Sequence, residues 1–285
     1  LPIWPAIPGV HALFTTRAGG VSQAPFDSLN LGDHVRDDPA AVAANRQILT
    51  AAIQRSNPGA RPVFLQQVHG CDVEALNART ADGTAADACV SDQPGAVCTI
   101  MVADCLPVLL AHRSAGVVAA AHAGWRGLAC EGGVGVLETV FARFMDLVQA
   151  QQAQAAIRNE AKGQPALPVQ TAAQVAADTQ IWLGPCIGSS AFEVGDEVRA
   201  AFVAASAPAA DCFAPGDAPG KWWGNLSGLA RQRLQALGLT GIYGNDGSAP
   251  WCTVTDSTRF FSHRRDAAVL GSTGRMAACI WLAPH

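Results

Sequence analysis

Short apolar runs that end at turn residues recur along the chain and predict β-strands. These runs cover residues 12–16, 63–68, 96–103, 117–121, 181–185 and 275–282. The three runs at 63–68, 96–103 and 117–121 are short and rich in β-branched residues, which favours buried strands. Pro107 is expected to end or bend the segment that follows residues 96–103, because proline has no amide proton to donate.

Apolar residues at helical spacing predict helices between these strands. Residues 39–52 follow Asp38, which fits an N-cap, and begin with Pro39, which fits the first helical position. Three more helices are expected, at residues 132–161, 195–205 and 226–237. Because strands and helices interleave, the sequence predicts an α/β or α+β fold with a mixed β-sheet core flanked by helices.

The whole chain, residues 1–285, is expected to form one domain, because no linker and no repeat of solenoid length interrupts it. Between residues 149 and 177 the composition shifts to alanine and glutamine, with two prolines. We interpret this stretch as an Ala/Gln-rich insertion that consists of a helical extension and an exposed loop, and we assign it no chemistry.

Composition and charge narrow the function classes. Hydrophobic residues make up 49% of the chain and charged residues 15%, which is typical of a globular protein rather than a disordered one. The 19 basic and 23 acidic residues give a net charge of −4, so we expect neither a nucleic-acid binder nor an electrostatic membrane binder. No apolar stretch reaches the roughly 18 residues of a membrane span, and no signal peptide opens the chain. Because the chain begins at Leu1, an initiator residue or short leader is expected to be missing from the sequence.

The nine cysteines do not form a recognisable disulfide framework, because their number is odd, their spacing is irregular and none forms a C-x-x-C pair. Some lie in apolar runs such as residues 96–100, where a free thiol behaves as a small buried hydrophobe. The cysteines therefore indicate packing roles in a reducing, cytoplasmic compartment.

Three metal-capable side chains, His69, Cys105 and His122, each lie beside a turn at the end of a predicted strand. They are 36 and 17 residues apart, so only the fold can bring them together. Two imidazoles and a thiolate suit zinc, and three protein ligands leave the fourth tetrahedral position open, as in catalytic sites. Such a site makes hydroxide available near neutral pH.

Cys105 and His122 could each have a structural role instead of a metal-binding one. A lone Cys105 would more often be an inert core thiol, and a lone His122 is often a hydrogen-bonded structural histidine. Gly124 and Gly127 favour the functional interpretation, since backbone must approach another group closely there. Asp104 is the adjacent carboxylate for proton transfer, although strand alternation would point it to the other face.

Three arginines form a second set of candidate residues, for binding substrate or phosphate. Arg17 lies in a turn with two glycines, Arg126 is four residues from His122, and Arg264 directly follows His263. A guanidinium presents a planar donor fork that matches phosphate or carboxylate, although surface salt bridges are the commoner role of a single arginine. No phosphate-binding loop of nucleotide triphosphatases, no G-x-G-x-x-G and no G-x-S-x-G is present.

Several longer motifs, taken in order, carry a resemblance that spans nearly the whole chain. They lie at residues 14–22, 28–32, 45–46, 67–70, 103–107, 122–127, 184–188 and 260–266. On these motifs the sequence resembles the YfiH or laccase-domain family, which is related to the human protein FAMIN and whose bacterial members were formerly described as multicopper polyphenol oxidases. Arg36 departs from the family pattern, because a glycine is usual at that position.

The resemblance implies a single-domain mixed α/β fold, shared distantly with a bacterial deamidating toxin domain. It also implies a zinc held by His69, Cys105 and His122, with copper as the alternative metal. The implied activity is phosphorolysis of purine nucleosides (adenosine, inosine and methylthioadenosine), together with adenosine deamination. The expected partners are these small molecules and phosphate, and the expected state is a monomer or dimer.

Of three other functions considered, one is rejected and two remain open as alternatives. A blue multicopper oxidase needs about ten histidines, many in H-x-H pairs. This chain has seven and no such pair, so we reject that chemistry. A metal-free hydrolase or deamidase would use Cys105 as nucleophile and His122 as base. A role in cell-wall quality control or partner binding would make catalysis secondary.

Overall fold

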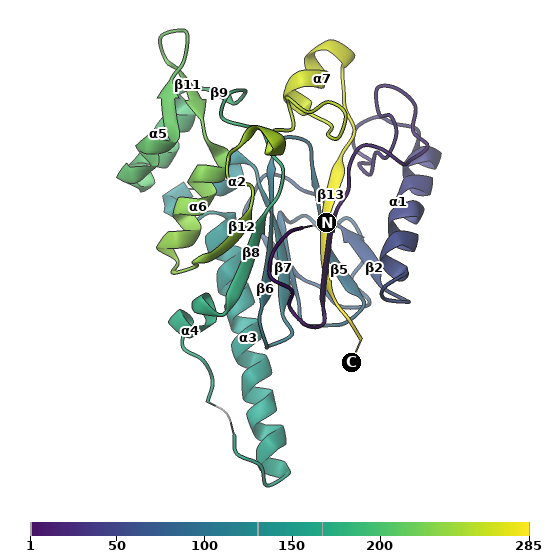
Figure 1. Ribbon diagram of the computed structural model, residues 1–285, viewed down its shortest axis with the longest axis vertical. Helices are drawn as coiled ribbons and strands as arrows, with labels where there is room; N and C mark the ends of the chain where they lie inside the picture. Colours follow the sequence, from purple (N-terminus) through teal and green to yellow (C-terminus); the bar gives the residue numbers. More distant parts are fainter. Residues whose placement is uncertain (1, 130, 167, 285) are drawn as a thin grey trace.

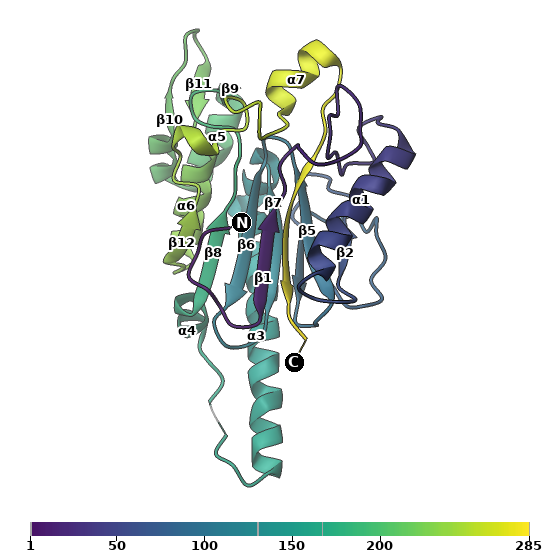
Figure 2. The same cartoon turned by 45° about the vertical axis from the view of Figure 1, so that its right-hand side comes forward.

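Two mixed β-sheets stack face to face, and helices cover their outer faces (Figures 1 and 2). The computed structural model describes residues 2–129, 131–166 and 168–284. The smaller of the two sheets has the order β1 (Val10–Phe14), β13 (Met276–Leu282), β5 (Ala96–Val102) and β2 (Arg61–Phe64). The larger has the order β12 (Gly241–Gly244), β8 (Thr179–Leu183), β6 (Leu106–His112), β7 (Val118–Ala123), β4 (Ala88–Ser91) and β3 (Val73–Ala75).

Parallel and antiparallel pairs occur in both sheets, which confirms the predicted mixed α/β fold. In the smaller sheet β2 pairs with β5 in parallel while β13 pairs with β5 antiparallel. In the larger sheet β8 lies between a parallel partner, β12, and an antiparallel one, β6. A third, small sheet of β9 (Glu193–Gly195), β11 (Lys221–Gly224) and β10 (Phe213–Pro215) stands apart from these two.

The alternation of side chains along β5 explains why this strand is buried throughout. Cys98, Ile100 and Val102 belong to the core between the two sheets. Val97 and Met101 point to the opposite face and pack in the core beneath α1 (Pro39–Gln54). Since successive residues of a strand face opposite sides, a strand covered on both faces is an unbroken apolar run.

Helices cover the larger sheet on its outer face and extend beyond it. The long α3 (Val136–Ala161) contacts β7 and β4, and α6 (Leu226–Ala236) packs beside it. The remaining helices are α2 (Trp125–Ala129), α4 (Ala172–Ala177), α5 (Asp196–Ala205) and α7 (His263–Leu270). In Figure 1, α7, β9 and β11 lie at one end of the molecule, and the last turns of α3 project from the other. None of the helices in the described ranges has the length and hydropathy that a membrane span requires.

The predicted helices are present with small shifts. Asp38 caps α1 as expected, because its Oδ1 accepts a hydrogen bond from the Ala40 amide at 3.0 Å. The helix predicted from residue 132 begins only at Val136, because Gly132 and Gly133 have positive φ angles of 70° and 80°. The expected helical extension is observed as far as Ala161, and an exposed chain follows, but the end of the stretch is not a loop: it forms α4, in which Val175 and Ala176 are buried. That residues 149–177 are an insertion remains a prediction.

Two predictions about single residue types were wrong. Pro107 does not end or bend its segment: it is the second residue of β6, near the strand start, where proline is tolerated, and its carbonyl accepts a hydrogen bond from Gly184. Cys71 is disulfide-bonded, although no cysteine was expected to be. Cys130 lies outside the described residues. Seven cysteines are free thiols, namely Cys89, Cys98, Cys105, Cys186, Cys212, Cys252 and Cys279, and all of these except Cys105 are buried, as predicted.

Arg36, where the sequence departs from the usual glycine, adopts a left-handed backbone with a φ of 70°. This conformation costs a residue with a Cβ atom about 1–2 kcal/mol. Arg36→Gly is therefore expected to raise the free energy of unfolding by about 1 kcal/mol, measured by urea denaturation. Arg55→Gly is the matched control, since Arg55 has an ordinary φ of −61° and its replacement should lower stability. If both variants lose stability, the strain at Arg36 is negligible.

Candidate metal centre and its cavity

The structure brings His69, Cys105 and His122 together. Their metal-binding atoms all lie within 4.8 Å of one another, and the Cys105 Sγ is 3.7 Å from the His69 Nε2. Cys105 occupies the turn between β5 and β6, and His122 lies near the end of β7, directly opposite the start of β6. His122 is buried, Cys105 is half-buried and His69 is exposed. Within the described residues, this is the one such group of three metal-capable side chains.

Asp87, which the sequence analysis missed, orients two of the three metal-capable residues. Its side chain is fully buried, and its Oδ1 accepts hydrogen bonds from the His122 Nδ1 at 2.8 Å and from the His69 amide at 2.9 Å. Its Oδ2 accepts from the amides of Val68 and Gly70. A carboxylate that binds one ring nitrogen of a histidine fixes the tautomer and leaves the other nitrogen for a metal. The signal in the sequence was a single acidic residue before the buried run of β4.

Glycines make room for this arrangement, as the sequence indicated. A Cβ atom on Gly124 would lie 2.9 Å from the Cys105 Sγ and 2.9 Å from the His69 Cδ2. A Cβ on Gly127 would lie 2.7 Å from the carbonyl oxygen of Gly70. Because real Cβ contacts are not that short, a larger residue at Gly124 would displace the side chains of Cys105 and His69, and one at Gly127 would displace the backbone at Gly70. Two imidazoles and a thiolate whose donor atoms lie within 4.8 Å of one another could hold a single metal ion.

The three metal-capable residues and Asp87 shift one another's pKa values. Burial opposes ionisation of the Cys105 thiol, but the charge and hydrogen bond of His122, together with those of His69, lower its pKa to about 6. Burial also opposes the charged form of His122, yet Cys105 and Asp87 raise its pKa to about 9. Burial of Asp87 is likewise outweighed, mainly by His122, so the pKa of its carboxyl is below the ordinary value. The protein alone therefore favours a thiolate, the form that binds metal or acts as a nucleophile.

A cavity of about 660 Å³ is lined in part by the three metal-capable residues. This volume suits a small organic ligand. Apolar side chains of its lining include Met101, Ile187, Phe192 and Leu226. Charged side chains of the lining are Arg126, Lys221, Arg264 and Arg275, with Asp104, Glu193 and Glu197. The cavity can thus contact both an apolar ring and an anion.

The three predicted arginines have different surroundings. Arg126 lines the cavity, and its Cζ lies 4.5 Å from the centre of the Trp125 ring. Its guanidinium makes no hydrogen bond to any described residue. Arg264 also lines the cavity, but its guanidinium donates to the carbonyl oxygens of Ala191 and Glu193, so it holds β9 in place.

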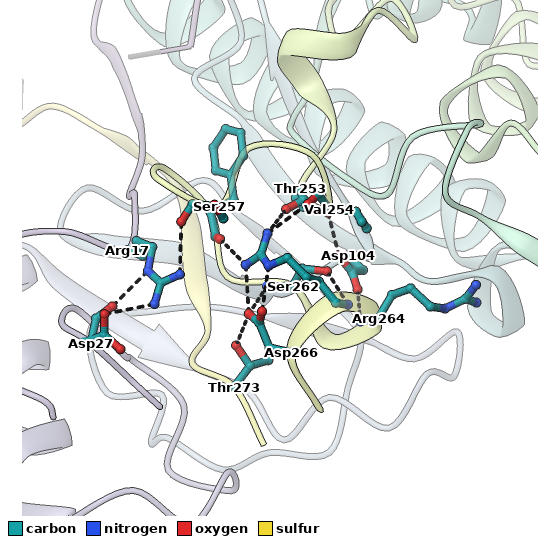
Figure 3. A network of polar contacts seen from close by, with 12 residues as sticks. Arg17, Asp27, Asp104, Thr253, Val254, Ser257, Ser262, Arg264, Asp266 and Thr273 are labelled. Atoms are coloured by element: carbon teal, nitrogen blue, oxygen red, sulfur yellow. Dashed lines mark hydrogen bonds and ion pairs between the residues drawn. The ribbon is translucent and has the colours of Figure 1, made fainter. Parts of the chain in front are cut away.

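Arg17 is not part of the cavity lining. Its guanidinium donates to the carbonyl and the carboxylate of Asp27 and to the carbonyl of Ser257, as Figure 3 shows. The structure does not bring Arg17 together with the three metal-capable residues.

Asp104 is part of the cavity lining. Strand alternation predicted that its side chain would point to the other face, but its φ of 89° turns the chain at the end of β5. Both of its carboxylate oxygens are engaged. Oδ1 accepts from the Thr253 hydroxyl at 2.6 Å and Oδ2 from the Arg264 amide at 2.6 Å, as Figure 3 shows. Asp104 thus ties the turn that carries Cys105 to the start of α7.

The fold and the site define a mixed α/β protein with one candidate His₂Cys metal centre in an open cavity. The chain belongs to the multi-copper polyphenol oxidoreductase laccase family, whose model matches residues 11–162 and 166–283. The resemblance to the YfiH or laccase-domain family is thereby confirmed.

Similar proteins cover almost the entire chain. A purine nucleoside phosphorylase of Pseudomonas aeruginosa is 45% identical over 281 residues, 99% of this chain and 97% of that protein. The purine nucleoside phosphorylase YfiH of Escherichia coli is 44% identical over 283 residues, 99% of this chain and 98% of that protein. The crystal structure of a Neisseria meningitidis protein has a TM-score of 0.79 at 40% identity and covers 99% of this chain and 98% of its own.

Proposed function

We propose that this protein is a zinc-dependent purine nucleoside phosphorylase. The observation that carries the proposal is the convergence of His69, Cys105 and His122 on a cavity that also presents apolar and cationic side chains. The names of the relatives in Pseudomonas aeruginosa and Escherichia coli support the same activity.

His69, Cys105 and His122 would hold the zinc ion, and Asp87 would orient His122. When bound, zinc would act as a Lewis acid and lower the pKa of a bound water. In the reaction a phosphate oxygen attacks C1′ of the ribose while the bond from C1′ to the purine nitrogen breaks. The purine leaves with the electron pair and takes up a proton, and ribose 1-phosphate remains.

The cavity residues favour phosphorolysis over the other reactions of this family. Phe192 and Leu226 offer apolar surface for a purine, and the guanidinium of Arg126, which makes no hydrogen bond to a described residue, is available to an anion. Adenosine deamination would require a carboxylate for proton transfer, and both oxygens of Asp104, the carboxylate adjacent to Cys105, already accept hydrogen bonds. A single three-ligand group in the described ranges also supports the rejection of a four-copper oxidase, whatever the family's name.

The test is to incubate the purified protein with adenosine, inosine or methylthioadenosine, with and without phosphate. We expect free purine base and ribose 1-phosphate in equal amounts, and only when phosphate is present. Chromatography of the base and an enzymatic assay of the sugar phosphate measure the two products. Release of base at the same rate without phosphate would overturn the phosphorylase proposal, and conversion of adenosine to inosine would reveal deamination.

A metal-free cysteine hydrolase is the second candidate, because Asp87, His122 and Cys105 also have the order of a Cys-His-Asp arrangement. In that case Cys105 would attack the substrate and His122 would transfer the proton. Metal analysis distinguishes the two candidates. One zinc per chain, with the Cys105 thiol protected from alkylation, would exclude the hydrolase.

A further inference from the structure

Arg275 directly precedes β13 and is a cavity residue that none of the sequence patterns singled out. It is half-buried, whereas Arg126, Lys221 and Arg264, the other cations of the lining, are exposed. A guanidinium that is partly removed from water interacts more strongly with an anion than an exposed one does.

Several contacts fix the position of Arg275. Its amide donates to the Asn30 Oδ1 at 2.9 Å, and its Nη1 donates to the carbonyl oxygens of Thr273 and Gly274 at 2.9 and 3.2 Å. On another side, a Cβ atom on Gly32 would lie only 2.7 Å from the Arg275 Cγ. The side chain is therefore held by hydrogen bonds from one of its three nitrogens, Nη1. Gly32 leaves room for its Cγ.

The other two nitrogens remain available. The Nε and Nη2 of Arg275 make no hydrogen bond to any described residue. Burial lowers the pKa of Arg275, while the negative charges of Cys105 and Asp104 act on it in the opposite direction. Neither of these residues forms an ion pair with it within the described residues. Arg275 and the three metal-capable residues line the same cavity, and two nitrogens of its guanidinium make no hydrogen bond to a described residue.

The other cavity cations are less suited to hold an anion beside the reacting atoms. The Arg264 guanidinium is occupied by the carbonyl oxygens of Ala191 and Glu193. Arg126 and Lys221 are exposed, and neither is fixed by a hydrogen bond of its side chain to a described residue. Arg275 alone combines partial burial, a fixed position and free donors.

We propose that Arg275 binds the phosphate co-substrate through its Nε and Nη2, as a planar fork on two phosphate oxygens. This inference rests on the proposed function for the identity of the anion. His34 stands on the same side of the cavity, because the Cβ position of Gly32 lies 3.4 Å from its Cε1 and 2.7 Å from the Arg275 Cγ. In this proposal, Arg275 is the residue that orients phosphate toward C1′.

The experiment measures phosphate binding directly, by calorimetry with inorganic phosphate, and separately the KM for phosphate and for inosine. In Arg275→Gln the dissociation constant and the KM for phosphate should rise about tenfold or more, and the KM for inosine should change less than about threefold. Arg275→Lys keeps the charge and loses the fork, so its effect should be intermediate. Arg113→Gln, a change far from this cavity in the turn after β6, is the matched control and should equal the wild type.

Gly32→Ala keeps the guanidinium but forces it to move, so it should weaken phosphate binding several-fold in a protein whose charge is unchanged. Thermal unfolding of each variant shows that it is folded. Phosphate binding by Arg275→Gln that equals the wild type, or an equal loss of inosine binding, would overturn the proposal. If the wild type binds phosphate through Arg275 but releases base without consuming it, the phosphorylase proposal fails while the anion site stands.

Discussion

Cys105→Ser is expected to lose the bound metal and to lower nucleoside phosphorolysis about a thousandfold. The serine hydroxyl is not ionised at neutral pH, so the site would keep only the imidazoles of His69 and His122. Lewis-acid stabilisation of a transition state is worth several kcal/mol, and about 1.4 kcal/mol corresponds to a factor of ten in rate. Elemental analysis of the purified variant and its kcat/KM for inosine measure the two effects.

The control for this variant is Cys98→Ala, which removes a thiol that is fully buried in β5 and belongs to the core between the sheets. It should lose some stability and keep both metal and activity. Alkylation supplies a second readout. In wild-type protein stripped of metal, the rate of alkylation of Cys105 should rise with pH through about 6, because His122 and His69 outweigh the effect of burial on its pKa. Full activity of the stripped protein, or retained metal in Cys105→Ser, would contradict a metal centre at these residues.

The sequence could predict the metal-capable residues because each lies near the point where an apolar run meets a turn. It could not show that they come from two sheets: His69 follows β2, Cys105 lies between β5 and β6, and His122 lies in β7. It could not predict Asp87. That residue is 18 positions from His69 and 35 from His122. A lone aspartate before an apolar run has no pattern that distinguishes a buried orienting carboxylate from a turn residue.

Among the arginines, the sequence analysis chose one residue that does not line the cavity and missed one that does. The glycine-containing turn around Arg17 favoured an anion site, but Asp27, ten residues further on, takes that guanidinium instead. Arg275 was part of a predicted strand and carried no signal, because its role depends on Gly32 and Asn30 at the other end of the chain. Contacts between distant segments therefore decide which cations face the cavity, and periodicity contains no information about them.

The fold was easier to predict from the sequence than the site, because the alternation of side chains within a strand is a local property. The run at residues 96–103 corresponds to β5, whose two faces belong to two different cores. β6 was missed because Pro107 was taken as a break, although proline near a strand start costs little. The short strands β9, β10 and β11 at the cavity side of the molecule were missed as well, since three or four residues give no measurable period.

Asp87→Asn is expected to destabilise the protein by about 3–5 kcal/mol and to weaken metal binding at least 10–100-fold. Each carboxylate oxygen of Asp87 accepts two N–H groups, from the His69 amide and His122 on one side and from Val68 and Gly70 on the other. An amide in place of the carboxylate turns one of these acceptors into an NH₂ donor that faces two donors. The loop that carries His69 and the ring of His122 then lose their common anchor. Urea denaturation and titration with zinc in a competing chelator measure the two effects.

Asp72→Asn is the matched control, because it removes the same charge from an exposed residue on the neighbouring turn. It should change stability by less than about 0.5 kcal/mol and leave zinc affinity unaltered. Urea denaturation and zinc titration together distinguish an effect of Asp87 on the orientation of the histidines from an effect on the stability of the fold. If Asp87→Asn loses stability yet binds zinc as tightly as the wild type, Asp87 acts only as a buried structural anchor. A loss of affinity that persists well below the unfolding transition would instead show that the carboxylate sets the position of both histidines.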